Sequence, residues 1–116
     1  MLGNPGVVIY SSINGGYLSV NGTSIGSPLM AGIVAIANQF RKNNSKPMLN
    51  SISTFSLCLQ QFLYKTIYTN QQLYATCLYD ITSGSDGNYT SAANYDIATG
   101  LGDVNANQLC SELANL

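Results

Sequence analysis

The sequence has no histidine, no tryptophan and few charged residues. Its 116 residues include four Lys or Arg and five Asp or Glu, so the formal net charge is −1 at pH 7. Without a basic patch, the chain has no electrostatic basis for binding nucleic acid. No apolar run reaches the roughly 18 residues that a membrane span requires. The three cysteines lack the spacing of metal ligands, and no histidine is present to complete a zinc site.

The cysteines, the first residues and the sequons leave the compartment open. A Cys58–Cys77 disulfide and free thiols are both compatible with the sequence. The chain begins without a charged region followed by an apolar one, so no signal peptide is expected. Sequons at Asn21, Asn43 and Asn88 suit a secreted glycoprotein, but they also arise by chance in a chain rich in Asn, Ser and Thr.

The chain is 46% hydrophobic, which is enough for the core of one modest domain. An uninterrupted apolar run extends from Pro28 to Ala37, and proline is well tolerated in a first helical turn. The run predicts a helix that begins at Ser24, reaches Phe40 to Lys42 and is buried on most sides. We expect four of its side chains to be buried: Leu29, Ile33, Ile36 and Ala37.

Shorter elements are predicted around this helix. The β-branched run 6–11 predicts a buried strand, and residues 17–20, after an Asn-Gly-Gly turn, predict a second strand. Residues 105–116 read as a closing helix. Apolar residues three to five positions apart predict an amphipathic helix that packs in the core: Ile52, Phe55, Leu59, Phe62 and Ile67.

Ser24, at the start of the apolar run, has two interpretations. Unpaired N–H groups and the positive end of the helix dipole would favour an oxyanion beside Ser24 Oγ, which suits a nucleophile. Alternatively, Thr23 or Ser24 is an N-cap whose only role is to begin the helix.

Residues 79–103 are the second informative stretch, because they hold four of the five acidic residues: Asp80, Asp86, Asp96 and Asp103. Calcium binds several carboxylate and carbonyl oxygens, and two aspartates separated by a Gly/Ser/Asn-rich loop can supply them. The ligand spacing of an EF-hand is missing. Alternatively, Ser85-Asp86-Gly87 is a turn and the other aspartates are caps.

Two motifs resemble those of the sedolisins, the serine-carboxyl peptidases. Gly-Thr-Ser, three residues and then Pro before a small-residue helix is similar to the nucleophile segment shared by sedolisins and subtilisins. Tyr-Asp-Ile-Thr-Ser-Gly followed by Tyr-Asp-x-x-Thr-Gly-Leu-Gly resembles the calcium-binding segment of sedolisins. Subtilisins lack the second pair, and they commonly have His after the motif proline, where this chain has Leu29.

The resemblance implies that residues 1–116 are the C-terminal portion of a sedolisin-like peptidase domain. The implied fold is α/β, a partial subtilisin-like fold in which short parallel strands pack with the long buried helix that starts at the serine. The implied function is hydrolysis of peptide or protein substrates, with Ser24 as the acyl-forming nucleophile. An acidic compartment, secreted or lysosomal, is implied as well.

The resemblance also implies a bound calcium ion. Its ligands would be the carboxylates of Asp80 and Asp96 and the main-chain carbonyl of Ile81. The remaining carbonyls come, in the family, from a Gly-x-Gly before the second aspartate. This chain has Ala92 and Asn94 at those two glycine positions, so the backbone path that glycine permits is in question.

The family's catalytic Glu, its supporting carboxylate and its oxyanion-hole Asp all precede the Gly-Thr-Ser segment. This chain has no acid before Ser24, has Gly6 where the family has Asp, and carries Glu112 only on the closing helix. Because a serine hydroxyl is a weak nucleophile without a nearby base, an upstream catalytic segment is an implied partner. The alternative is an inactive remnant or a calcium-stabilised interaction unit.

Overall fold

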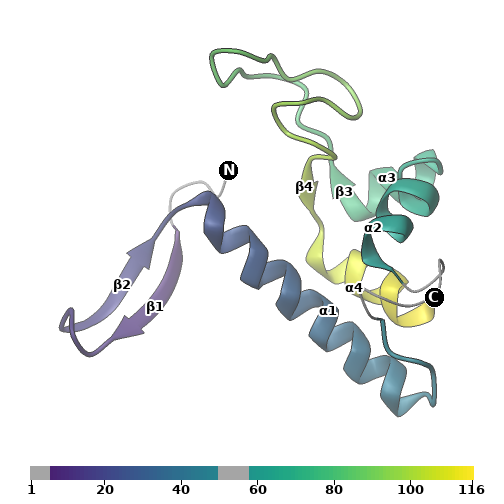
Figure 1. Ribbon diagram of the computed structural model, residues 1–116, viewed down its shortest axis with the longest axis horizontal. Coiled ribbons are helices and arrows are strands. Elements are labelled where there is room, and N and C mark those ends of the chain that lie inside the picture. Colours follow the sequence, from purple (N-terminus) through teal and green to yellow (C-terminus); the bar gives the residue numbers. More distant parts are fainter. Residues whose placement is uncertain (1–5, 50–57) are drawn as a thin grey trace.

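The computed structural model describes residues 6–49 and 58–116. Figure 1 shows a hairpin that extends from one end of a long helix, with shorter helices and a second pair of strands beside that helix. In chain order the elements are β1 (Val7–Ser11), β2 (Gly16–Val20), η1 (Thr23–Ile25), α1 (Gly26–Asn43), α2 (Leu59–Phe62), η2 (Leu63–Ile67), α3 (Gln71–Cys77), β3 (Leu78–Tyr79), β4 (Asp103–Val104) and α4 (Ala106–Asn115).

The two predicted N-terminal strands form an antiparallel hairpin, with register from Val7 opposite Val20 to Ser11 opposite Gly16. Both strands are therefore confirmed. The expected burial of the first is wrong, because its three central side chains are exposed. The reason is that no other described element covers either face of the hairpin.

The described strands form two sheets of two strands each, β1–β2 and β3–β4, and both are antiparallel. The parallel strands that the sedolisin resemblance implies are not seen in residues 6–49 and 58–116. A tight turn joins β1 directly to β2, and strands connected in this way can pair only antiparallel. The described part of the chain is a mixture of helices and small antiparallel sheets.

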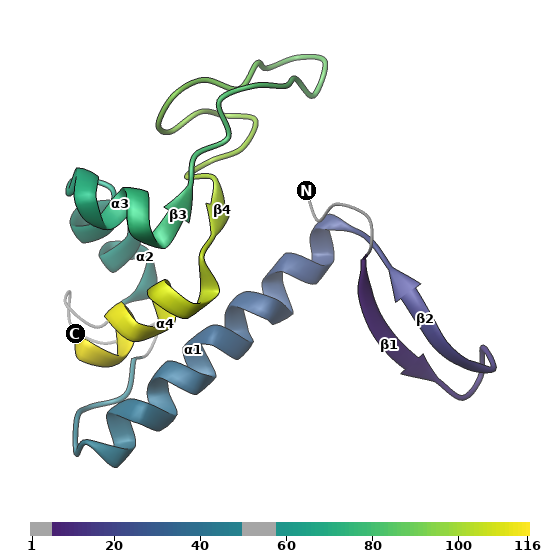
Figure 2. The ribbon, with the colours of Figure 1, turned by 180° about the vertical axis from the view of Figure 1, so that it is seen from behind.

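The long helix is confirmed in extent but not in burial. Helical structure begins with η1 and continues through α1 to Asn43, one residue beyond the predicted end. Ala37 is fully buried and Ile33 is half-buried, whereas Leu29 and Ile36 are 43% and 50% exposed. Helix α4 packs along one side of α1 (Figure 2), and the other sides have little described cover, which explains the difference.

Arg41 and Lys46 join the end of α1 to the end of α4. Arg41 is buried, and it donates from Nε to the Pro47 carbonyl at 2.7 Å and from Nη1 to the Leu113 carbonyl at 3.0 Å. Lys46 Nζ donates to the Asn115 carbonyl at 2.7 Å. The last carbonyls of a helix lack intrahelical partners and carry partial negative charge, so both cations stabilise the C-terminus of α4.

The core lies between α1, α4 and the segment from α2 to β3. Of the predicted amphipathic helix, Phe62 and Ile67 are buried, and Ile52 and Phe55 lie outside the described residues. The closing helix is confirmed as α4, and the Asn105 side chain caps it by accepting from the Gln108 N–H. The buried apolar residues are Ala37, Leu49, Phe62, Ile67, Tyr74, Cys77, Leu78, Leu109 and Leu113.

All three cysteines, Cys58, Cys77 and Cys110, are free thiols, so the possible Cys58–Cys77 disulfide is not formed. Burial raises the pKa of the Cys77 thiol, which keeps it protonated and unreactive. None of the described helices combines the length and the apolar character that crossing a membrane requires.

Candidate functional site

Ser24 lies in η1, immediately before α1, and its side chain is exposed. No side chain caps either η1 or α1, so the interpretation of Thr23 or Ser24 as an N-cap is not supported. Within the described part of the chain, no hydrogen bond involves Ser24 Oγ. The hydroxyl is therefore accessible at the N-terminal end of an 18-residue helix.

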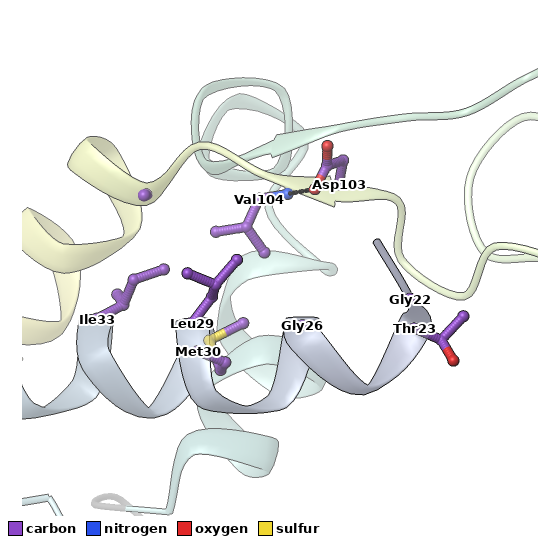
Figure 3. Close-up of a pocket in the computed structure, with 9 residues that line it drawn as sticks. Gly22, Thr23, Gly26, Leu29, Met30, Ile33, Asp103 and Val104 are labelled. Carbon is purple, nitrogen blue, oxygen red and sulfur yellow. Dashed lines mark hydrogen bonds between the residues drawn. The ribbon is translucent and has the colours of Figure 1, made fainter. Parts of the chain in front are cut away.

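A groove of about 510 Å³ runs beside the start of α1. Figure 3 shows α1 on one side of the groove and β4 on the other. Its lining residues are Gly22, Thr23, Gly26, Leu29, Met30, Ile33, Asp103, Val104 and Ala106. Most of these are apolar or small, and Asp103 is the only acidic residue among them.

Asp103 thus lines the same groove as Gly22 and Thr23 of the nucleophile segment, which the sequence did not reveal. Its Oδ1 accepts from the Val104 N–H at 2.8 Å, so the carboxylate is engaged by its own strand (Figure 3). Among the described residues, no acid forms a hydrogen bond with Ser24.

The fold brings Asp80 and Asp96 to the same short backbone segment. Asp80 Oδ2 accepts from the Asn94 N–H at 2.7 Å, and Asp96 Oδ2 accepts from the Ala92 N–H at 3.1 Å. The segment belongs to the long loop between β3 and β4, drawn in green in Figure 1. Two carboxylates that are 16 positions apart in the sequence are thus held by donors only two residues apart.

Thr99 holds the Asp96 carboxylate from the other side. Its N–H donates to Asp96 Oδ1 and its hydroxyl donates to Oδ2, both at 2.8 Å. The hydrogen bond from the Ala92 N–H and those from Thr99 hold the pKa of Asp96 below its usual range, against the opposing effect of burial. An aspartate three residues before a threonine is a common turn pattern, so this contact could have been predicted.

Tyr74, on α3, connects Asp80 to the end of the loop. Its hydroxyl lies 3.2 Å from Asp80 Oδ1 and 3.1 Å from the Leu101 carbonyl, and it is positioned to donate to either. Burial, followed by the negative charge of Asp80, raises the pKa of Tyr74 to about 12. The ring packs edge-to-face on Tyr68 at a centroid distance of 5.8 Å. Nothing in the local sequence indicated this role.

The predicted calcium ligands are near one another, but two of them present the opposite polarity. Ala92 and Asn94 direct N–H groups, not carbonyls, toward the carboxylates. Asn94 has the left-handed φ of 68° that glycine would adopt easily. No three His, Cys, Asp or Glu side chains of residues 6–49 and 58–116 form a metal-binding group. The oxygen donors fit calcium by type, and binding would require these N–H groups to be exchanged for carbonyls.

Two glycines permit close backbone approaches around these segments. A Cβ at Gly102, where φ is 92°, would overlap the Tyr79 carbonyl across the β3–β4 pair. A Cβ at Gly6 would overlap the Asn21 side chain and the Val20 carbonyl. The aspartate that sedolisins have at this second position would therefore not fit here without movement of residues 20–21.

Comparison with models of protein families, with curated proteins and with solved structures gives no match for this chain. The sedolisin resemblance accordingly rests on the two motifs and on their order in the chain.

We predict that Tyr74→Phe lowers the free energy of unfolding by about 1 kcal/mol at pH 7, because it removes a partly buried hydrogen bond. The raised pKa also has a pH consequence. Since the folded state holds this proton more tightly than the unfolded state, the stabilisation is complete below pH 10 and is lost as pH rises toward about 12. Urea unfolding between pH 7 and 11 should show a smaller alkaline loss in the variant.

Tyr89→Phe is the matched control, because Tyr89 is exposed in the same loop. The interpretation of Tyr74 would be contradicted if both variants retained the same alkaline loss as the unmodified chain.

Proposed function

We propose that this chain is the nucleophile-bearing C-terminal part of a serine-carboxyl peptidase, which hydrolyses peptide bonds through Ser24. The observation that carries the proposal is the convergence of Asp80 and Asp96 on the 92–94 segment. These are the two carboxylates that the sedolisin motifs assign to one calcium ion, and they are 16 positions apart in the sequence.

The surroundings of Ser24 support the role of nucleophile. Its hydroxyl is exposed and has no hydrogen-bond partner among the described residues. The first N–H groups of η1 and α1 and the positive end of the helix dipole favour negative charge on a tetrahedral intermediate formed there. The groove does not include Ser24 in its lining, but it begins at the neighbouring Thr23, and Leu29, Met30 and Ile33 could accept an apolar part of a peptide substrate.

The proton of Ser24 has no acceptor within the described part of the chain. When Ser24 Oγ attacks a peptide carbonyl, the hydroxyl proton must pass to a base, which then donates it to the leaving amine. The proposal therefore requires a carboxylate from a segment outside this sequence, which would have to lie within hydrogen-bond distance of Ser24. Calcium, when bound, would neutralise Asp80 and Asp96 and fix the loop between β3 and β4.

The proposal predicts that calcium raises the melting temperature of the chain. A ligand that binds only the folded state adds about 2.7 kcal/mol of stability at one hundred times its dissociation constant. Differential scanning calorimetry with calcium and with a chelator measures the shift. Asp96→Asn should abolish the shift in melting temperature, because the amide lacks the negative charge that binds calcium. Its NH₂ group would also lie opposite the Ala92 and Thr99 donors that now bind the carboxylate.

Asp103→Asn is the matched control, since it removes an exposed carboxylate outside the proposed ligand set. It should leave the calcium shift unchanged. Equal melting temperatures with calcium and with chelator would refute the calcium site. An equal response in both variants would refute its assignment to Asp96.

The second candidate is a non-catalytic remnant that retains the loop. It is favoured by the absence of any described acid hydrogen-bonded to Ser24. The reading frame upstream of the sequence distinguishes the two candidates: a Glu-x-x-x-Asp motif supports the peptidase, and an in-frame stop codon directly before Met1 supports the remnant.

A further inference from the structure

The long loop between β3 and β4 carries negative charge and no positive charge of its own. Residues 79–103 contain four aspartates and no Lys or Arg, and residues 66–116 contain no basic residue at all. The proposed calcium site uses Asp80 and Asp96, which leaves Asp86 and Asp103 without a role. These two aspartates line one hollow in the loop.

This loop hollow has a volume of about 430 Å³. Its lining comes entirely from residues 81–103, so it is built by one segment, which projects beyond the helices in Figure 1. The volume falls within the roughly 300–1,000 Å³ that is usual for small-molecule sites. Carboxylates, hydroxyls and apolar side chains share its walls: Asp86, Asp103, Ser83, Ser91, Ile81 and Ala98.

Each of the two carboxylates has one oxygen without a hydrogen-bond partner. Asp86 Oδ1 accepts from the Tyr89 N–H at 2.7 Å and from the Asn88 N–H at 2.8 Å, and Asp103 Oδ1 accepts from its neighbour Val104. In the described part of the chain, no hydrogen bond involves either Oδ2 atom. The bonds from Tyr89 and Asn88 hold the pKa of Asp86 below its usual range, so this carboxylate is charged at neutral pH.

The direction of the Asp103 side chain agrees with this placement. Figure 3 shows the side chains of Asp103 and Val104 on opposite sides of β4, with Val104 directed toward α1. Successive side chains of a strand alternate in this way. The Asp103 carboxylate is therefore on the side of β4 that faces away from α1.

Ser91 provides an independent indication of a ligand. The residue is only 8% exposed, and its N–H donates to the Gly84 carbonyl at 2.9 Å. Its hydroxyl, however, has no hydrogen-bond partner in the described part of the chain. Ser91 Oγ lies 3.8 Å from the position that a Cβ would take at Gly84, which also lines the loop hollow. Because buried polar side chains normally have a partner, a free hydroxyl in the wall of a hollow indicates a polar ligand.

We propose that the loop hollow binds a short linear diamine, with one ammonium group at Asp86 and the other at Asp103. An ammonium group has three donors and no acceptor, so it suits the free carboxylate oxygens and the hydroxyls of Ser83 and Ser91. Two positive charges balance the two negative charges of the hollow. The alkyl chain between them contacts Ile81 and Ala98.

The observations favour an organic dication over a metal ion. Direct metal sites use several protein ligands, and no three His, Cys, Asp or Glu side chains of residues 6–49 and 58–116 form such a group. The hollow is also more than ten times larger than the roughly 30 Å³ that one water molecule occupies. A monoamine would leave one carboxylate without a counter-charge. The proposal depends neither on Ser24 nor on calcium.

Isothermal titration calorimetry of the full chain with diaminopropane, diaminobutane and diaminopentane tests this proposal. We expect one molecule bound per chain, with a dissociation constant below about 1 mM for the best of the three. A salt concentration of about 0.15 M screens non-specific attraction. Butylamine has the carbon chain of diaminobutane but only one amino group, and it should bind at least tenfold more weakly.

Substitutions test the two carboxylates and the free hydroxyl. Asp86→Asn and Asp103→Asn should each weaken diamine binding at least tenfold, and Ser91→Ala should weaken it about threefold. Glu112→Gln is the matched control, because it removes one negative charge from α4, outside the hollow, and it should leave binding unchanged. Circular dichroism checks that each variant keeps its helices.

The ligand series on the unmodified chain keeps the proposal testable even if a variant fails to fold. No binding of any of the three diamines, or equally tight binding of butylamine, would overturn it. Unchanged binding in both aspartate variants, or an equal loss in Glu112→Gln, would do the same. Displacement of the diamine by an equal concentration of magnesium would show a metal site instead.

Discussion

Replacing Ser24 with alanine should lower peptidase turnover by roughly three to six orders of magnitude in a protein that contains this chain together with its carboxylate-bearing segment. The variant loses the only atom that forms the acyl bond in the proposed mechanism, while the helix keeps its start because Ser24 makes no capping bond. Initial rates on a fluorogenic peptide at acidic pH measure the effect. The 116-residue chain alone should show no turnover, because no described acid acts as a base.

Ser27→Ala is the matched control, since Ser27 is exposed in the first turn of the same helix. It should retain nearly full activity. Two results would contradict the assignment: activity that survives Ser24→Ala, or hydrolysis by the isolated chain that disappears in Ser24→Ala.

Arg41→Ala should lower the free energy of unfolding by about 3 kcal/mol. The substitution leaves the Leu113 carbonyl, at a buried bond, and the Pro47 carbonyl, at a partly buried bond, without their donor, and it opens a cavity between α1 and α4. Guanidinium unfolding followed by circular dichroism measures the loss. Arg41→Lys should recover only part of it, because a single ammonium group does not reproduce the planar geometry of two guanidinium donors.

The neighbouring Lys42→Ala is the appropriate control, because Lys42 is exposed and its side chain lies outside this contact. We expect a change within about 0.5 kcal/mol for it. Similar losses for the two variants would mean that Arg41 does not hold the end of α4.

Local signals predicted the elements of this fold well. Proline at the start of an apolar run and the cations near its end located α1 almost to the residue. Residues 105–116 were read as the closing helix, which begins at the Asn105 cap in the structure, and the Asn-Gly-Gly turn marked the hairpin. These features depend on a few neighbouring residues, so the sequence reveals them directly.

Burial and distant contacts could not be predicted in the same way. The apolar run of α1 favours a helix that is buried on most sides, yet Leu29 and Ile36 are exposed because only one face meets α4. The contact of Arg41 joins positions 72 apart, and that of Tyr74 with the Leu101 carbonyl joins positions 27 apart. No local pattern encodes such pairings.

At Ala92 and Asn94, in contrast, the sequence identified the positions at which the backbone conformation would matter. Replacing the family's two glycines was expected to affect the backbone path near the aspartates. The structure adopts the left-handed path at Asn94 and directs N–H groups at both carboxylates. The sequence could not reveal whether the N–H group or the carbonyl of these peptides would face the two carboxylates.

The joining of α1 to α4 has a consequence for the order of events during synthesis. The guanidinium of Arg41 can form its hydrogen bond with the Leu113 carbonyl only after the ribosome has added that residue, 72 positions later. Closing so long a loop costs conformational entropy before any favourable contact between its ends offsets that cost. Leu109, which is fully buried like Leu113, is added 68 residues after Arg41. A nascent chain therefore keeps the opposite side of its core exposed until this segment has been translated.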